Sequence, residues 1–172
     1  MQIDLGHAGD RESFSFDEGF ALTGGGGEDL QCRAAVTAVM TKSGNRFLLE
    51  GTIRAAIQAE CARCLAPFEH GLETAFSVVL QRGGGAAVPE GIEEADFVLL
   101  GEGEEYRYDI FPHVRESILL EMPIRFLCRE ECAGICPRCG ANRNEGPCGC
   151  GDGNGDPRWG DLKKLLNKDD ER

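Results

Sequence analysis

The sequence has few aromatic residues, a single Trp and no long apolar run. Phe, Trp and Tyr make up 7% of its 172 residues, which argues against an RNA-binding surface built on stacked aromatic rings. A membrane helix needs about 20 consecutive apolar residues, and no stretch approaches that length. The N-terminal residues have neither the basic segment nor the apolar core of a signal peptide. We therefore expect a cytoplasmic protein with no membrane-spanning segment.

The sequence also lacks the common catalytic motifs. It contains no HExxH, no GxSxG, no P-loop, and no GxGxxG between a strand and a helix. The glycine run 24–27 is followed by two acidic residues, without the Lys and Ser/Thr that hold a nucleotide. The three histidines are isolated from one another and from the cysteines. These absences predict a protein that is not an enzyme.

Charge is present mainly in one sign. The chain has 18 Lys and Arg against 30 Asp and Glu, a net charge of −12. Residues 1–127 contribute −11 of this charge, and residues 128–172 contribute −1. An acidic surface repels phosphate backbones, so contact with RNA would need a local basic patch. The alternative partner of the acidic part is a basic protein.

Apolar residues alternate with polar ones over most of the first half, which predicts β-strands. We expect a short strand or hairpin over residues 12–22 and strands over residues 32–41, 47–57, 68–81 and 97–100. Asp109 heads a predicted helix over residues 109–121 that Pro123 ends, and Asp156-Pro157 heads a second one over 156–167. The predicted fold is α+β: a mostly antiparallel sheet, open or closed into a barrel, with one covering helix. We expect an acidic body over 1–127 and a cysteine-rich tail over 128–172 that together form one compact unit.

Eight of the nine cysteines fall in two places, which indicates metal chemistry rather than disulfides in a reducing cytosol. The preferred set is two short-spaced pairs that can close one tetrahedral zinc site: Cys136, Cys139, Cys148 and Cys150. An alternative replaces Cys148 or Cys150 with Cys132. A second zinc site would form if the turn that contains Cys61 and Cys64 folds over the tail. Its ligands would be Cys61, Cys64, Cys128 and Cys132.

The pair Cys61 and Cys64 has two further interpretations. It can be a reactive dithiol, in which case Arg63 would lower a thiol pKa. It can equally be two small buried residues at a strand end. Cys32 alternates with core residues, and we expect it to serve packing alone.

The order of these features resembles the bacterial YceD family, the large ribosomal RNA subunit accumulation proteins, and within it the cysteine-rich branch. Three segments carry the resemblance: Cys61-Ala-Arg-Cys64-Leu65, then Gly134-Ile-Cys136-Pro-Arg-Cys139-Gly-Ala-Asn142-Arg-Asn144, then Asp156-Pro-Arg-Trp159. The resemblance covers roughly residues 20–167. It implies a role in 23S rRNA accumulation and large-subunit assembly, and an association with ribosomal protein L32.

These considerations lead to one main functional prediction and one alternative. The main prediction is a non-enzymatic assembly factor whose acidic body engages a ribosomal protein or a large-subunit precursor. Its zinc-binding tail would approach rRNA or the partner through Arg63, Arg138, Arg143, Arg158 and Trp159. The alternative is a thiol-redox or metal-handling protein that uses Cys61 and Cys64.

Overall fold

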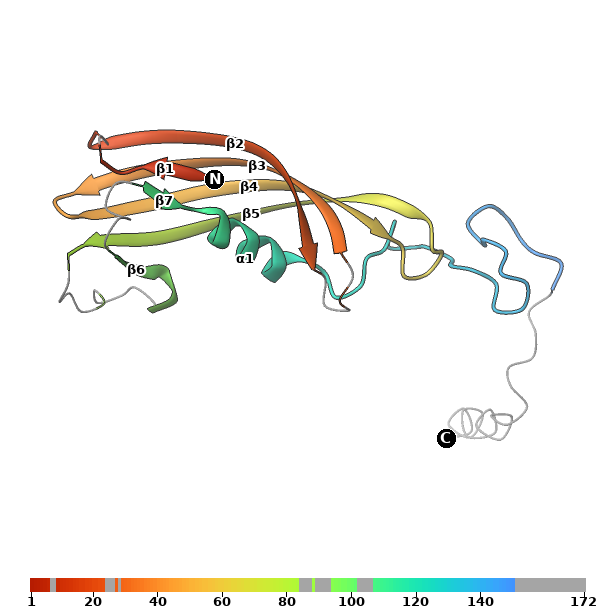
Figure 1. Ribbon diagram of the computed structural model, residues 1–172. Helices are drawn as coiled ribbons and strands as arrows, with labels where there is room; N and C mark the ends of the chain where they lie inside the picture. The colour runs from red at the N-terminus through yellow and green to blue at the C-terminus, as the bar shows by residue number, and fades with distance from the viewer. Residues whose placement is uncertain are drawn as a thin grey trace, which may run out of the picture. The chain divides into compact units, whose positions relative to one another are not determined.

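The computed structural model describes residues 1–6, 9–23, 27, 29–83, 88, 94–101 and 107–150 (Figure 1). The chain divides into two compact units. The first contains Met1–Ala62 and Ala66–Cys128, and the second contains Arg63–Leu65 and the residues from Arg129 onward. The predicted helix over 156–167, with Arg158 and Trp159, lies outside the described residues.

The first unit is built on one five-stranded sheet with the strand order β2-β3-β4-β5-β6. The first four strands form an antiparallel meander, and β6 pairs with the end of β5 in parallel. In the described chain β2 does not pair with β6, so the sheet is open and the barrel alternative is wrong. The strands are β2 (Arg11–Thr23), β3 (Asp29–Ser43), β4 (Arg46–Glu60), β5 (Pro67–Arg82) and β6 (Phe97–Leu100).

The predicted α+β class with a mostly antiparallel sheet and one helix is confirmed. Apolar and polar residues alternate along the long strands, because every second side chain of a β-strand faces the core. In β3, for example, five residues on one face are all buried: Cys32, Ala34, Val36, Ala38 and Met40. The possible hairpin near residue 17 is absent, and β2 runs straight through. Asp17 there accepts two hydrogen bonds from Arg33 of β3, which favours pairing over a turn.

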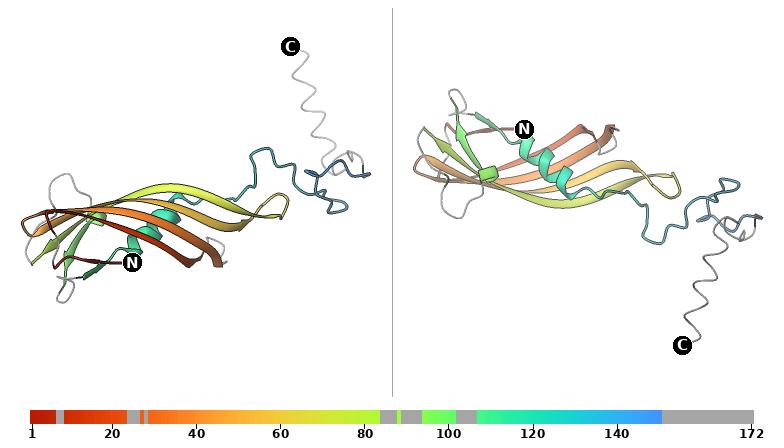
Figure 2. Two further views of the ribbon diagram at one scale, coloured as in Figure 1. Left: turned by 90° about the horizontal axis from the view of Figure 1, so that it is seen from above. Right: turned by 90° about the horizontal axis from the view of Figure 1, so that it is seen from below.

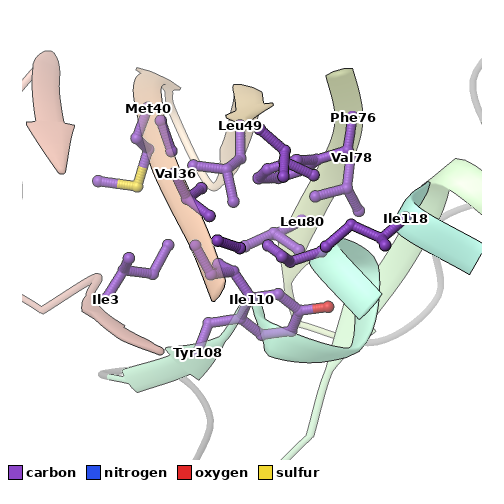
Figure 3. Packing of buried hydrophobic residues seen from close by; sticks show 14 of the residues in the cluster. Ile3, Val36, Met40, Leu49, Phe76, Val78, Leu80, Tyr108, Ile110 and Ile118 are labelled. Atoms are coloured by element: carbon purple, nitrogen blue, oxygen red, sulfur yellow. The ribbon is translucent and has the colours of Figure 1, made fainter. Parts of the chain in front are cut away.

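Helix α1 (Phe111–Glu121) covers one face of this sheet (Figures 1 and 2). Ile110 and Ile118 lie among the inward-facing side chains of β3, β4 and β5 (Figure 3). A two-stranded sheet of β1 (Gln2–Asp4) and β7 (Arg107–Asp109) adds Ile3 and Tyr108 to the same core. These two short strands were not predicted. Within the described residues, no helix has the length and apolarity that crossing a bilayer requires.

The helix begins at Phe111, two residues later than predicted. Asp109 is the last residue of β7 and pairs with Gln2, so its backbone belongs to the sheet. Its carboxylate still accepts a hydrogen bond from the Phe111 N–H at 3.0 Å, and lies 3.2 Å from the N-terminal amine of Met1. Asp109 therefore stabilises the start of the helix from outside it.

Candidate metal centres

All nine cysteines lie in the described part of the chain, and no disulfide joins any two of them. Eight of them form two groups of four, and within each group the sulfur atoms lie within 4.8 Å of one another. In a tetrahedral zinc site with Zn–S bonds of about 2.3 Å, neighbouring sulfurs are about 3.8 Å apart. Each group could therefore hold a metal ion. The turn tetrad is Cys61, Cys64, Cys128 and Cys132, and the tail tetrad is Cys136, Cys139, Cys148 and Cys150.

The tail tetrad lies within the second unit, and a tight backbone turn positions its first two thiols. The Cys136 N–H donates to the Ala141 carbonyl at 2.8 Å, and the Gly140 N–H donates back to the Cys136 carbonyl at 2.8 Å. Gly140 adopts φ 73°, a left-handed conformation that glycine accepts without strain. This turn closes the loop between Cys136 and Cys139 and directs its N–H groups toward the first sulfur.

Those N–H groups make Cys136 acidic. The backbone N–H of Cys139, then that of Arg138, then the Cys148 thiol lower the pKa of Cys136 to about 6. The hydrogen bond with Cys139, followed by burial, raises the pKa of Cys150 to about 12. Without a counter-charge, one thiolate therefore keeps a neighbouring thiol protonated. A divalent cation supplies that charge, so metal binding would release protons from this tetrad.

Two asparagines of the second unit stabilise the loop between Cys139 and Cys148. The Asn142 carbonyl oxygen accepts hydrogen bonds from the backbone N–H and the side-chain amide of Asn144, at 3.0 and 2.8 Å. The Asn144 carbonyl oxygen accepts from the Ala133 N–H at 2.8 Å and from Arg129 at 2.6 Å. Both asparagines therefore shape this loop through hydrogen bonds to neighbouring groups.

Asn144 also interacts with a thiol directly, which the sequence alone did not indicate. Its side-chain amide donates to the Cys132 sulfur, with an N–S distance of 3.3 Å. Amide donors to sulfur are typical of the residues that surround metal ligands. The spacing of twelve residues between the two gave no signal of this interaction.

Arg63 interacts with the backbone of the second unit. Its guanidinium donates to the carbonyls of Glu130 at 2.9 Å and Cys132 at 3.1 Å. Its own carbonyl accepts from the Ile135 N–H at 3.1 Å. Arg63 therefore orders residues 130–135, and its predicted contact with a partner stays a prediction.

The turn after β4 is held by backbone bonds of the first unit. The Cys61 N–H donates to the Ala66 carbonyl at 3.0 Å, and the Ala62 N–H donates to the Phe126 carbonyl at 2.8 Å. Leu65 completes the turn with φ 59° and is the one non-glycine residue of the described chain with positive φ. Such a conformation costs about 1–2 kcal/mol and persists where the surroundings impose it.

The other predicted residues have separate environments. Cys32 belongs to neither tetrad and is buried in the sheet core, where burial raises its pKa to about 11. Its expected packing role is confirmed. Arg138 and Arg143 are exposed in the second unit. Cys132, one alternative ligand of the tail site, is grouped with the turn tetrad instead.

Comparison with known proteins identifies the family. Residues 49–166 match the family described as large ribosomal RNA subunit accumulation protein YceD. An uncharacterized protein of Mycobacterium tuberculosis is 30% identical over 124 residues, which cover 72% of this chain and 58% of that protein. The chloroplastic YCED homolog 1 of Arabidopsis thaliana, a large ribosomal RNA subunit accumulation protein, is 27% identical over 162 residues, covering 77% and 48%.

The chain spans about half the length of the curated relatives it matches. No solved structure matches it. The matched segment contains all eight cysteines of the two tetrads. The chain belongs to the YceD family of large ribosomal RNA subunit accumulation proteins.

Proposed function

We propose that this protein is a non-enzymatic assembly factor of the cytoplasm that supports 23S rRNA accumulation and assembly of the large ribosomal subunit. The observation that carries the proposal is the family match over residues 49–166, because the family is described by the accumulation of large-subunit rRNA. The arrangement of the cysteines supports a structural role for them. A catalytic zinc keeps one coordination position open for water or substrate, whereas each tetrad supplies four protein thiols.

Zinc is the metal that the tail tetrad fits best. Four thiolates in tetrahedral reach favour zinc over the oxygen-binding cations calcium and magnesium. In the second unit, Cys136, Cys139, Cys148 and Cys150 would hold this ion, and the backbone N–H groups that lower the Cys136 pKa would stabilise its thiolate. A bound zinc would stabilise this unit, because the residues of it that the structure describes include few buried apolar side chains.

The proposed partners follow from charge. Residues 1–127 carry a net charge of −11, which suits a basic ribosomal protein such as ribosomal protein L32. The exposed Arg138 and Arg143 of the second unit would contact the partner or rRNA, together with Arg158 and Trp159. Most thiols of the turn tetrad are buried and shielded from solvent oxidants, which favours a structural role over thiol-redox catalysis.

The proposal is tested by deleting the gene in its host and measuring the ratio of 23S to 16S rRNA, with subunit profiles from sucrose gradients. We expect less 23S rRNA and fewer large subunits, restored by the wild type and by Cys32→Ala. The tail variant Cys136→Ser with Cys139→Ser should fail to restore them. An unchanged ratio after deletion would refute the role.

Binding assays then separate protein partners from RNA. Purified ribosomal protein L32 should bind the wild type, and the affinity should fall as salt screens the acidic body. If Arg138 and Arg143 interact with phosphate, replacing both with Ala should weaken binding to a 23S rRNA fragment. The slope of log affinity against log salt should then become shallower by about 1 for each arginine–phosphate pair that the substitution removes. Equal slopes for the wild type and the double variant would show that these two arginines do not contact phosphate, and the second unit would then bind protein partners only.

A further inference from the structure

A cavity of about 410 Å³ lies in the first unit, where β5, α1 and the short 3₁₀-helix η1 (Glu94–Asp96) come together. Helix α1 packs mainly against β5 (Figure 2), and β6 pairs with β5 only from Val79 onward. The volume is within the range of about 300–1,000 Å³ that is usual for binding pockets. The lining includes Ser77 of β5, Asp96 of η1, and His113, Glu116, Ser117 and Leu120 of α1.

One side of α1 forms a wall of this cavity. His113, Glu116 and Leu120 are three and four residues apart, so their side chains project from the same side of the helix. Ser117, four residues after His113, lies on that side too. The buried Ile118 projects from another side, into the core of the sheet (Figure 3). The helix therefore packs on the sheet with one side and faces the cavity with another.

The charges that face the cavity are of one sign. Glu116 and Asp96 contribute carboxylates, and no Lys or Arg of the described chain lines the cavity. Both carboxylates raise the pKa of His113, but burial is the larger effect and lowers it. The ring is therefore neutral at pH 7. Two carboxylates face this cavity without a cation from the described residues that line it.

His113 is held in place by two aromatic residues of the core. Its Nε2 lies 2.7 Å from the hydroxyl oxygen of Tyr108. Its ring stacks on that of Phe76, with the ring centroids 6.4 Å apart. Tyr108 and Phe76 are both buried members of the core (Figure 3). This wall of the cavity is therefore fixed before a ligand binds, which lowers the entropy cost of binding.

The remaining lining matches a long basic side chain. Leu120 lines the cavity, yet its side chain is 81% exposed. Lys and Arg combine a charged head with an apolar stem, and the stem packs well on such a surface. A divalent cation fits less well. In the described chain, only the two cysteine tetrads bring at least three metal-ligating side chains within 4.8 Å of one another.

We propose that this cavity binds an arginine side chain of a basic protein partner, with the guanidinium at Glu116 and Asp96 and the stem against Leu120. A guanidinium has five N–H donors in one plane and can bond two carboxylates at once, whereas an ammonium group is a point charge. The hydroxyls of Ser77 and Ser117 can accept the remaining N–H groups. The inference rests on the proposed function for the nature of the partner, since the net charge of −11 over residues 1–127 favours a basic protein.

The test is an NMR titration of the full chain, labelled with ¹⁵N, with short peptides. One peptide carries a single Arg between glycines, with both ends blocked. Matched peptides carry Lys, or citrulline, which has nearly the shape of Arg without its charge. We expect the Arg peptide to bind most tightly and the citrulline peptide to cause no saturable shifts. The shifts should be concentrated at the lining residues, namely Ser77, Asp96, His113, Glu116, Ser117 and Leu120.

Variants then separate this cavity from general attraction to an acidic protein. Glu116→Gln and Asp96→Asn should each weaken binding of the Arg peptide by about 2–5-fold. Glu18→Gln is the matched control, because it removes the same charge from an exposed position of β2 outside the cavity. It should leave the affinity unchanged. An equal loss in Glu18→Gln, shifts spread over the whole sheet, or no binding of the Arg peptide would overturn the inference.

Failure of this inference can be told apart from failure of the ribosomal role. Gene deletion with measurement of the 23S to 16S rRNA ratio tests the role without reference to the cavity. A lowered ratio without peptide binding at the cavity would overturn the inference and leave the role intact. Peptide binding at the cavity with an unchanged ratio would support arginine binding there and refute the role.

Discussion

Gly51 of β4 lies against a neighbouring side chain, which a methyl group at position 51 would displace. A Cβ at Gly51 would lie 2.2 Å from Cε1 and 2.6 Å from Cζ of the Phe76 ring on β5. Ordinary carbon–carbon separations are about 3.5–4.0 Å, so the ring must move by roughly 1 Å or more. Phe76 is only 9% exposed and its ring stacks on His113 of α1, which restricts that movement.

We therefore expect Gly51→Ala to destabilise the first unit by about 1–3 kcal/mol, the usual cost of overpacking. Urea unfolding followed by far-UV circular dichroism measures it. With m near 1–3 kcal/mol/M, the midpoint should fall by roughly 1 M. Gly71→Ala is the matched control, because Gly71 pairs into the same sheet and has open space around its Cα. It should be neutral or stabilise by less than about 1 kcal/mol.

The double variant Gly51→Ala with Phe76→Leu separates steric overlap from an intrinsic effect of the backbone. Leu has no ring to overlap the new methyl group, so Gly51→Ala should cost less in this background than in the wild type. Equal midpoints for Gly51→Ala and Gly71→Ala, or an unchanged cost in the Phe76→Leu background, would refute the reasoning.

Three further predictions concern the second unit and pH. Gly134→Ala should reduce zinc affinity or protease resistance more than Gly140→Ala, because both have positive φ but only the first would meet a backbone oxygen at 3.0 Å; equal effects would contradict the packing. Burial lowers the pKa of His113 more than Glu116 and Asp96 raise it. Protonation therefore favours the unfolded chain. The wild-type urea midpoint should fall more steeply below about pH 6.5 than that of His113→Gln. Parallel curves of midpoint against pH for the two proteins would contradict this effect of His113. Chelator treatment should make residues 129–150 protease-sensitive before the sheet unfolds, and simultaneous unfolding of both would contradict separate metal stabilisation.

The long strands could be predicted because alternation is local. The polarity of each residue in β3 and β4 indicates which face of the sheet it occupies, and the alternation of its neighbours agrees with that assignment. The short β1 and β7 could not be predicted, because three residues carry too little pattern and their pairing joins the start of the chain to the segment just before α1. The helix start was misplaced because Asp109 serves the sheet and the helix at once.

The grouping of the cysteines could likewise be predicted only where the ligands are close in sequence. Spacing alone indicates the tail set, since Cys136–Cys139 and Cys148–Cys150 are close in sequence. It left the grouping of Cys132 open, because that depends on where the distant β4–β5 turn lies. The hydrogen bond from Asn144 to Cys132 depends on a folded loop and has no sequence signature.

We propose that a metal ion held by thiolates alone stabilises the cysteine-rich part of this protein. Zinc K-edge X-ray absorption on the purified full chain tests it most directly. We predict a first shell of four sulfur atoms per zinc at about 2.3 Å, with no nitrogen or oxygen ligand. A shell that contains nitrogen or oxygen, or fewer than four sulfurs, would contradict the assignment of the tail tetrad as a closed structural site.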